Sequence, residues 1–183
     1  AVISSGIEYP LWNEDQDNPL PAMPYGSAGW TKDDDRFLVY DRYDIWALDP
    51  TGTKAPVNIT AGQGRKTGVT YRYVRTDREK RFFNPGDEIL LSVFRHDDKQ
   101  NGIATMKIGA VAAPAIRTIE PKSFSQIAKA KNAPVYAFQK ADFSTSPQIY
   151  IATATNFAKA AKVTDANPQM ADYSWGTAQL AKW

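Results

Sequence analysis

Short apolar segments, each followed by a polar turn and a second apolar segment, recur three times along the chain. The three pairs are residues 37–40 with 43–49, 89–94 with 102–108, and 135–138 with 148–153. Apolar segments of this length, bounded by turn-forming residues, are typical of β-strands, and a polar connection between two of them indicates a hairpin. The pattern therefore predicts three β-hairpins.

In the first hairpin, both faces of the second strand are apolar. Ile45 and Ala47 fall on one face and Trp46 and Leu48 on the other, because successive side chains of a strand point to opposite sides. A sheet with one face in water alternates between apolar and polar residues instead. We therefore expect this sheet to be covered on both faces.

The hairpins recur at a nearly regular spacing. Phe37, Ile89 and Val135 begin them and are 52 and 46 residues apart by subtraction of their numbers. A repeat of about 40–50 residues is expected for four-stranded propeller blades. Extended segments at 57–60, 69–74 and 115–119 would supply further strands. The sequence thus predicts an all-β fold, namely a partial β-propeller of about three antiparallel four-stranded blades.

The beginning of the chain has a different character. Prolines at positions 10, 19, 21 and 24 interrupt it, and proline prevents long regular elements. We expect residues 1–29 to form an irregular approach or an incomplete blade, and residues 30–183 to form the blades.

Residues 123–132 allow two interpretations. Phe124, Ile127 and Ala128 have the spacing of one helix face, whereas residues 123–127 also alternate as in a strand. We favour the strand.

Composition narrows the functional classes. The chain has 183 residues, a net charge of +2, no cysteine and one histidine, His96. The balanced charge gives no sign of a nucleic-acid partner, and no apolar segment reaches the roughly 18 residues of a membrane span. The lack of cysteine excludes thiol nucleophiles, Cys-bound zinc and iron–sulfur clusters. We expect no cofactor.

The sequence lacks the pattern of an activated nucleophile. A serine hydrolase of the α/β type needs G-x-S-x-G, and the nearest segment, residues 26–29, has the wrong spacing and is expected to be a turn. His96 lies beside Asp97 and Asp98 in a charged turn, where a solvated side chain is expected rather than a general base. We assign no catalytic residue to this chain.

Two further patterns have plain structural interpretations. Residues 33–35 are three aspartates without the D-x-D-x-D-G spacing of a calcium loop, and aspartate suits the turn between two strands. We therefore predict no metal site. Residues 62–66 read GQGRK, but G-x-G without a Walker lysine or a following helix is a weak phosphate-loop pattern. We interpret this segment as a loop that joins two blades.

Several segments resemble a known family. GWTKDDDRFLVYDRYDIWALDPTG (29–52) resembles a propeller blade of bacterial prolyl-oligopeptidase-like serine peptidases, which include dipeptidyl and acylaminoacyl peptidases. PQIY (147–150), VTDANPQ (163–169) and WGTAQLAKW (175–183) are similar to the last blade that leads into the α/β-hydrolase domain. Two features depart from the family: Gln179 replaces an acidic residue, and the 95–101 turn is more polar.

The resemblance implies a function. The chain would be the C-terminal part of the non-catalytic propeller of a serine peptidase, which corresponds to the N-terminal domain of dipeptidyl peptidases. It would gate and orient peptide substrates for a hydrolase domain absent from this chain. The implied location is periplasmic or secreted.

Arginines and tyrosines near predicted turns are the candidate substrate-binding residues. They are Arg42, Tyr43, Arg65 and Arg72. In the resembled peptidases, propeller residues that face the catalytic domain can help to fix one end of a peptide, and guanidinium groups suit carboxylates and carbonyls. Structural salt bridges and stacked aromatic residues are the competing interpretation of the same residues.

Two other functions stay open. One is a propeller-type protein-binding or scaffold module without a peptidase link. The other is a sugar-binding β domain that uses its five tryptophans, although most of these occupy apolar strands and resemble core residues.

Overall fold

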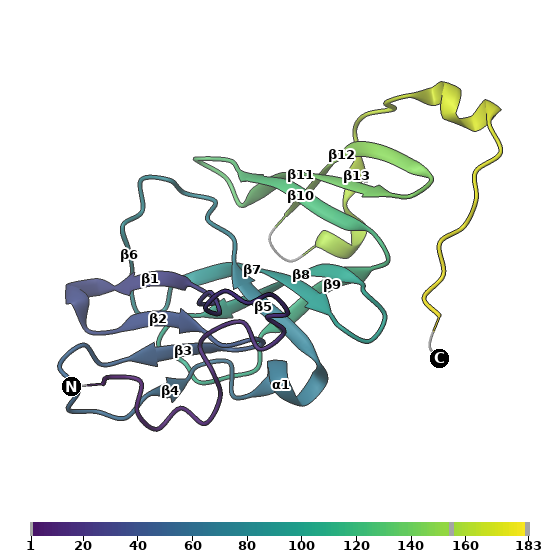
Figure 1. Ribbon diagram of the computed structural model, residues 1–183. Coiled ribbons are helices and arrows are strands. Elements are labelled where there is room, and N and C mark those ends of the chain that lie inside the picture. The colour runs from purple at the N-terminus through teal and green to yellow at the C-terminus, as the bar shows by residue number, and fades with distance from the viewer. Residues whose placement is uncertain (1, 154–155, 182–183) are drawn as a thin grey trace.

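The three predicted hairpins are present, and each belongs to a different sheet of the computed structural model (Figure 1). They are β2–β3 (Phe37–Tyr40 and Ile45–Leu48), β7–β8 (Glu88–Arg95 and Asn101–Lys107) and β11–β12 (Val135–Asp142 and Thr145–Thr153). The structure describes residues 2–153 and 156–181. Strands dominate these residues, so the predicted all-β class is confirmed.

The first sheet has the order β4–β3–β2–β1–β6. Its other strands are β1 (Ser27–Thr31), β4 (Val57–Asn58) and β6 (Phe82–Phe83). The first four strands form an antiparallel meander, and β6 pairs parallel with the outer edge of β1. The short 3-10 helix η1 (Lys32–Asp34) carries two of the three aspartates in the turn between β1 and β2, as predicted.

The second and third sheets are antiparallel and have four strands each, in the orders β5–β7–β8–β9 and β10–β11–β12–β13. The third is a simple meander, whereas the chain leaves the second sheet between β5 and β7 to add β6 to the first. Their other strands are β5 (Val69–Tyr73), β9 (Ala115–Glu120), β10 (Ser123–Lys129) and β13 (Ala161–Lys162). The strand interpretation of residues 123–127 is thus confirmed.

Three short helices complete the elements described: α1 (Gln63–Thr67), η2 (Phe157–Lys159) and η3 (Pro168–Asp172). The interpretation of residues 62–66 as a plain loop was wrong, because α1 forms one turn of helix there.

The second sheet lies between the other two and is covered on both faces (Figure 1). Leu91 and Val93 of β7 pack into a core shared with the first sheet, whereas Leu90 packs into a second core shared with the third sheet. The second core includes Phe138 of β11 and Phe157 of η2, each 1% exposed or less. Because neighbouring residues of β7 face different layers, its inner residues are apolar on both faces except at Ser92.

Gly102 permits the close approach of β8 and β9. A Cβ at this position would lie 2.1 Å from the carbonyl oxygen of Thr118. The ladder between β8 and β9 also shifts register between Ile103 and Ala104. Glycine is therefore required here by the neighbouring backbone rather than by a turn.

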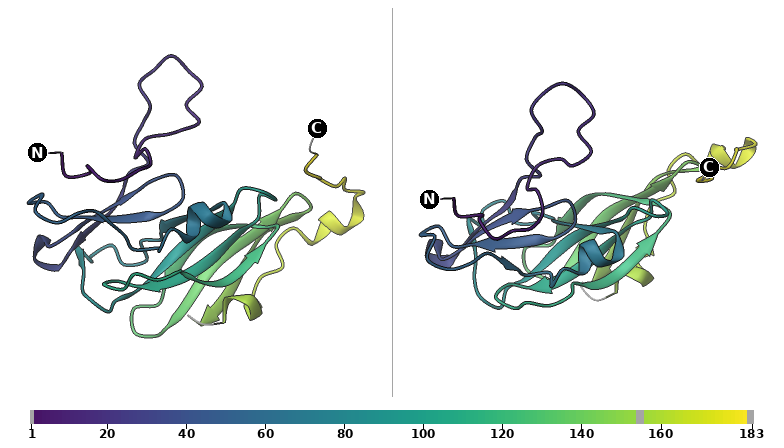
Figure 2. Two further views of the ribbon diagram at one scale, coloured as in Figure 1. Left: turned by 90° about the horizontal axis from the view of Figure 1, so that it is seen from below. Right: turned by 60° about the horizontal axis from the view of Figure 1, so that its bottom comes forward.

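The two ends of the described chain lie outside the sheets. A loop of the N-terminal segment, closed at its base by a bridge between Trp12 and Pro24, stands away from the body (Figure 2). After η3, an extended tail carries Trp175, whose indole Nε1–H donates to the Met170 carbonyl (2.8 Å). The last two residues of the WGTAQLAKW segment lie outside the described residues.

Candidate functional site

The turn between β2 and β3 presents Arg42 and Tyr43 at one end of the first sheet. The buried Asp41 carboxylate accepts hydrogen bonds from the backbone N–H groups of Tyr43 (2.7 Å) and Asp44 (2.6 Å). Aspartate favours such turns because its carboxylate reaches the N–H groups that follow it. The strand predicted from residue 43 therefore begins two residues later, and Arg42 and Tyr43 belong to the turn.

Helix α1 places Arg65 beside this turn. The Asp44 carboxylate accepts hydrogen bonds from the backbone N–H groups of Gly64 (2.8 Å) and Arg65 (2.9 Å) and from the Thr60 hydroxyl (2.6 Å). The first N–H groups of a helix have no partner within the helix, so a carboxylate here fixes its N-terminal turn. Gly64 is required, because a Cβ would lie 2.8 Å from Asp44 Oδ1.

Arg42, Tyr43 and Arg65 form one group, which we call the arginine site. The ring of Tyr43 contacts both guanidinium groups, whose Cζ atoms lie 5.2 Å (Arg42) and 5.0 Å (Arg65) from the centroid of the ring. Arg65 also stacks on Tyr9 at 3.8 Å. Such stacking holds a planar guanidinium while its N–H groups stay free to donate in the plane.

The two guanidinium groups bind neighbouring carboxylates of the N-terminal segment. Arg42 Nη1 donates to Asp15 Oδ1 (2.9 Å), and Nη2 pairs with Oδ2 (2.7 Å). Arg65 donates from Nη1 and Nη2 to the two oxygens of Glu14 (3.5 and 3.1 Å). Burial lowers the pKa of Arg65, but hydrogen bonding to Glu14 and the charges of Asp41 and Glu14 outweigh it and raise the pKa overall. The carboxylate of Glu14 therefore stabilises the charged form of Arg65.

Arg72, the fourth candidate, lies next to the arginine site but is bound to the backbone. Its guanidinium donates to the carbonyl oxygens of Tyr71 (2.8 Å), Asp41 (2.9 Å) and Arg42 (3.1 Å) and stacks on Tyr40 (4.6 Å). Burial lowers its pKa. Arg72 thus ties β5 to the turn that carries Arg42.

His96 is half-buried, which corrects the expectation of a solvated turn residue. Its ring packs against Tyr43 (5.1 Å) and Phe94 (4.9 Å), and its Nε2 lies 2.8 Å from the Thr70 hydroxyl. That hydroxyl donates its proton to the Arg42 carbonyl (2.9 Å), so the network assigns the imidazole proton to Nε2. Burial, followed by the charge of Arg42, lowers the pKa of His96.

The chemistry that this arrangement supports is binding. Thr70 and His96 have the separation of a nucleophile and its base, but the hydroxyl proton points to a carbonyl and the imidazole donates instead of accepting. The two guanidinium groups are suited to bind carboxylates, because each can donate two parallel N–H groups to the two oxygens of one carboxylate. Within residues 2–153 and 156–181, no group of three or more His, Asp or Glu side chains is arranged to hold a metal ion. No helix in this part of the chain is long and apolar enough to cross a membrane.

The sequence analysis missed the acidic half of the site. Glu14 and Asp15 lie in a proline-interrupted segment without periodicity, so no element placed them near the arginines. Only opposite charge could have indicated this contact, because residues 14–17 contain three acids and the predicted turns at residues 42 and 65 contain arginines.

A second concavity lies at the opposite end of the first two sheets. This cavity of about 470 Å³ is lined on one side by residues of the first core, among them Leu38, Ile59 and Ile108, and on the other by the polar residues that connect β1 and β2, including Lys32, Asp33, Asp35 and Arg36. The Arg36 Nη1 atom is buried, with no hydrogen-bond partner among the residues described. The candidate residues from the sequence do not contribute to this cavity.

Comparison with known proteins gives no significant match: no protein-family model and no curated protein matches the sequence, and no solved structure matches the fold. The resemblance to propeller peptidases therefore depends on its sequence segments. The fold and the arginine site stand on the geometry of this chain alone.

Proposed function

We propose that the chain forms three successive blades of a β-propeller, and that these blades are the non-catalytic part of a prolyl-oligopeptidase-like serine peptidase. The propeller would cap the active site of a hydrolase domain, admit short peptides and orient them. One observation carries the proposal: three sheets that follow one another along the chain, each built on four antiparallel strands, pack face to face through two successive cores, with β6 as a fifth, parallel strand at the edge of the first. Propeller blades are four-stranded sheets repeated in this manner.

The segments that resemble the family are compatible with this arrangement. Residues 29–52 span most of β1 and all of β2 and β3, which together form one continuous part of the first meander. Residues 147–150 belong to β12, and residues 163–169 directly follow β13, the last strand of the third sheet. These three segments therefore coincide with part of one sheet or directly follow its last strand.

The arginine site supplies a place for a peptide. It lies where the β2–β3 turn, α1 and the beginning of β5 meet, and loops at one end of such sheets are the usual position of binding residues. Arg42 and Arg65 would bind a carboxylate of the peptide, Tyr43 would hold both guanidinium groups, and Arg72 would position the turn. The periplasmic or secreted location belongs to the same proposal.

The test begins with the reading frame downstream of the Trp183 codon. We expect it to encode G-x-S-x-G, and we expect the protein made from the full frame to hydrolyse short peptides and to react with a fluorophosphonate, a reagent for activated serines. The 183-residue chain is the matched control and should do neither. A downstream frame without the motif, or labelling of the control, would refute the proposal.

The second candidate is a protein-binding or scaffold module built from the same blades. The observation that favours it is a site that binds carboxylates through Arg42 and Arg65, while the Thr70 hydroxyl beside it donates its proton to a carbonyl. A downstream frame without a hydrolase motif would leave this module as the better account.

A further inference from the structure

The arginine site holds two adjacent carboxylates in a geometry that is specific for carboxylates. Each guanidinium offers two N–H groups to the two oxygens of one acid, with Arg42 on Asp15 and Arg65 on Glu14. Paired donors of this kind match a planar carboxylate better than a single cation does. The site therefore recognises two acids in sequence, one per arginine.

The body of the protein fixes the backbone of both arginines without help from the acids. The Asp44 carboxylate fixes the backbone of Arg65, and the carbonyl of Arg42 accepts hydrogen bonds from Thr70 and Arg72. The Nε atoms of Arg42 and Arg65 are buried and have no hydrogen-bond partner among the described residues. The backbone positions of the two arginines are thus formed in advance, and each side chain keeps one unused donor.

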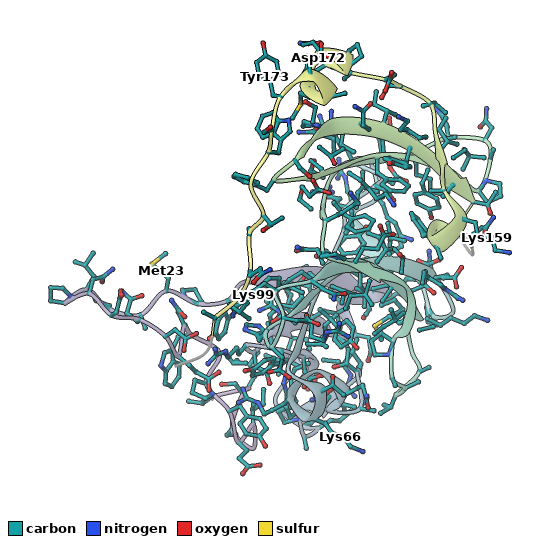
Figure 3. The ribbon with its side chains drawn as sticks, turned by 90° about the vertical axis from the view of Figure 1, so that its right-hand side faces the viewer. Met23, Lys66, Lys99, Lys159, Asp172 and Tyr173 are labelled. Atoms are coloured by element: carbon teal, nitrogen blue, oxygen red, sulfur yellow. The ribbon has the colours of Figure 1, made fainter. Side chains whose placement is uncertain are left out.

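The segment that supplies the acids is held weakly. Its loop projects from the body and extends beyond Met23, which lies near the base of the loop (Figure 3). The Asp15 side chain is 62% exposed, whereas that of Glu14 is 22% exposed, so Asp15 is the more weakly held of the two acids. Leu20 and Met23 are 68% and 70% exposed, so the loop buries little apolar surface. Ion pairs with an exposed partner contribute little to stability, since water and salt screen them. Other carboxylates can therefore compete for the arginines.

We propose that Arg42 and Arg65 form a binding site for a peptide with two adjacent acidic side chains, and that the chain's own Glu14 and Asp15 occupy this site as an internal substitute. The inference takes from the proposed function only that the ligand is a peptide. Binding requires the N-terminal loop to leave the arginines. The internal acids therefore lower the apparent affinity for the external peptide.

The test is binding of a fluorescent peptide with a central Glu-Asp pair, measured by anisotropy on the 183-residue chain. The double variant Glu14→Gln with Asp15→Asn removes the internal charges and keeps the side-chain shapes. We expect it to bind the peptide about tenfold more tightly than the natural chain, and salt should weaken this binding. The matched control, Asp17→Asn in the same loop, should bind like the natural chain.

Two further comparisons assign the binding to the arginines. A peptide with Gln-Asn in place of Glu-Asp should not bind, and adding Arg65→Lys to the double variant should remove most of the gain, because lysine keeps the charge but loses the fork. Equal binding of both peptides, or no gain in the double variant, overturns the proposal. Neither result depends on a hydrolase domain, so this failure is distinct from a failure of the proposed function.

A second measurement needs no variant. In the natural chain, the Glu14 backbone N–H donates to the Tyr25 hydroxyl (2.8 Å) and the Asn13 N–H donates to the Met23 carbonyl (2.8 Å). Saturating acidic peptide should release the loop and speed hydrogen exchange of these amides, while the amides of β2 and β3 stay unchanged. Unchanged exchange at residues 13 and 14 under saturating peptide also overturns the proposal.

Discussion

Asp44 connects the two parts of the backbone that carry the arginines. It lies in the turn that presents Arg42, is 1% exposed, and holds the first turn of the helix that presents Arg65. Replacement by alanine removes all three hydrogen bonds to the carboxylate. The N–H groups of Gly64 and Arg65 lose their acceptor, whereas the Thr60 hydroxyl can still donate to Asn58 Oδ1 (2.8 Å). We expect Asp44→Ala to destabilise the protein and to free Arg65 from its place.

The magnitude follows from these three hydrogen bonds. A hydrogen bond to a charged group contributes about 1.5–3 kcal/mol, and a buried donor left unpaired costs about 1–3 kcal/mol. Removing the buried charge also removes the free energy needed to desolvate it, which offsets part of the loss. We therefore expect a net loss of about 3–5 kcal/mol for Asp44→Ala. Asp44→Asn keeps one acceptor oxygen, but its NH₂ group then faces the N–H of Arg65, and two donors cannot form a hydrogen bond. We therefore expect Asp44→Asn to lower the free energy of unfolding by about 1–3 kcal/mol.

The assay is urea unfolding followed by tryptophan fluorescence, since Trp30 and Trp46 belong to the first sheet. The midpoint should fall in the order natural chain, Asp44→Asn, Asp44→Ala, with an unchanged slope. Asp17→Ala, at an exposed position, is the control and should change the free energy of unfolding by less than about 0.5 kcal/mol. A loss under about 1 kcal/mol for Asp44→Ala would show that the carboxylate does not hold α1, and the reasoning would fail.

Two further predictions concern the second core and the single histidine. Phe138→Ala should lower the free energy of unfolding by about 3–5 kcal/mol. It should speed hydrogen exchange in β11 and β12 more than in β2 and β3, because the core that contains Phe138 joins the third sheet to the second and does not reach the first. Equal acceleration in all sheets would contradict this. Burial lowers the pKa of His96 from 6.5 in the folded state, so the unfolded chain binds more protons and stability should fall as the pH drops below about 6.5. His96→Gln should flatten this dependence in urea unfolding at several pH values, and identical profiles for both proteins would exclude the histidine as its source.

The main strands could be predicted because both faces of the inner ones are buried. In β7, residues that face different cores alternate along the chain, which produces the continuous apolar segment seen in the sequence. β6 has only Phe82 and Phe83 and lies in a charged stretch, so no periodicity marked it, although Phe83 is 4% exposed in the first core. Helix α1 was missed for a related reason, since an aspartate 20 residues away supports its first turn.

The arginine site shows the same division between local and distant determinants. Residue type and position near a turn were sufficient to select Arg42, Tyr43 and Arg65, because turn geometry depends on neighbours such as Asp41. Their partners are 27 and 51 residues away, in a segment whose placement depends on the assembled sheets. Nothing in the arginines themselves specifies that the carboxylates must come from this chain. For that reason the contacts with Glu14 and Asp15 indicate that the ligand carries two carboxylates, but they do not require that these carboxylates belong to the same chain.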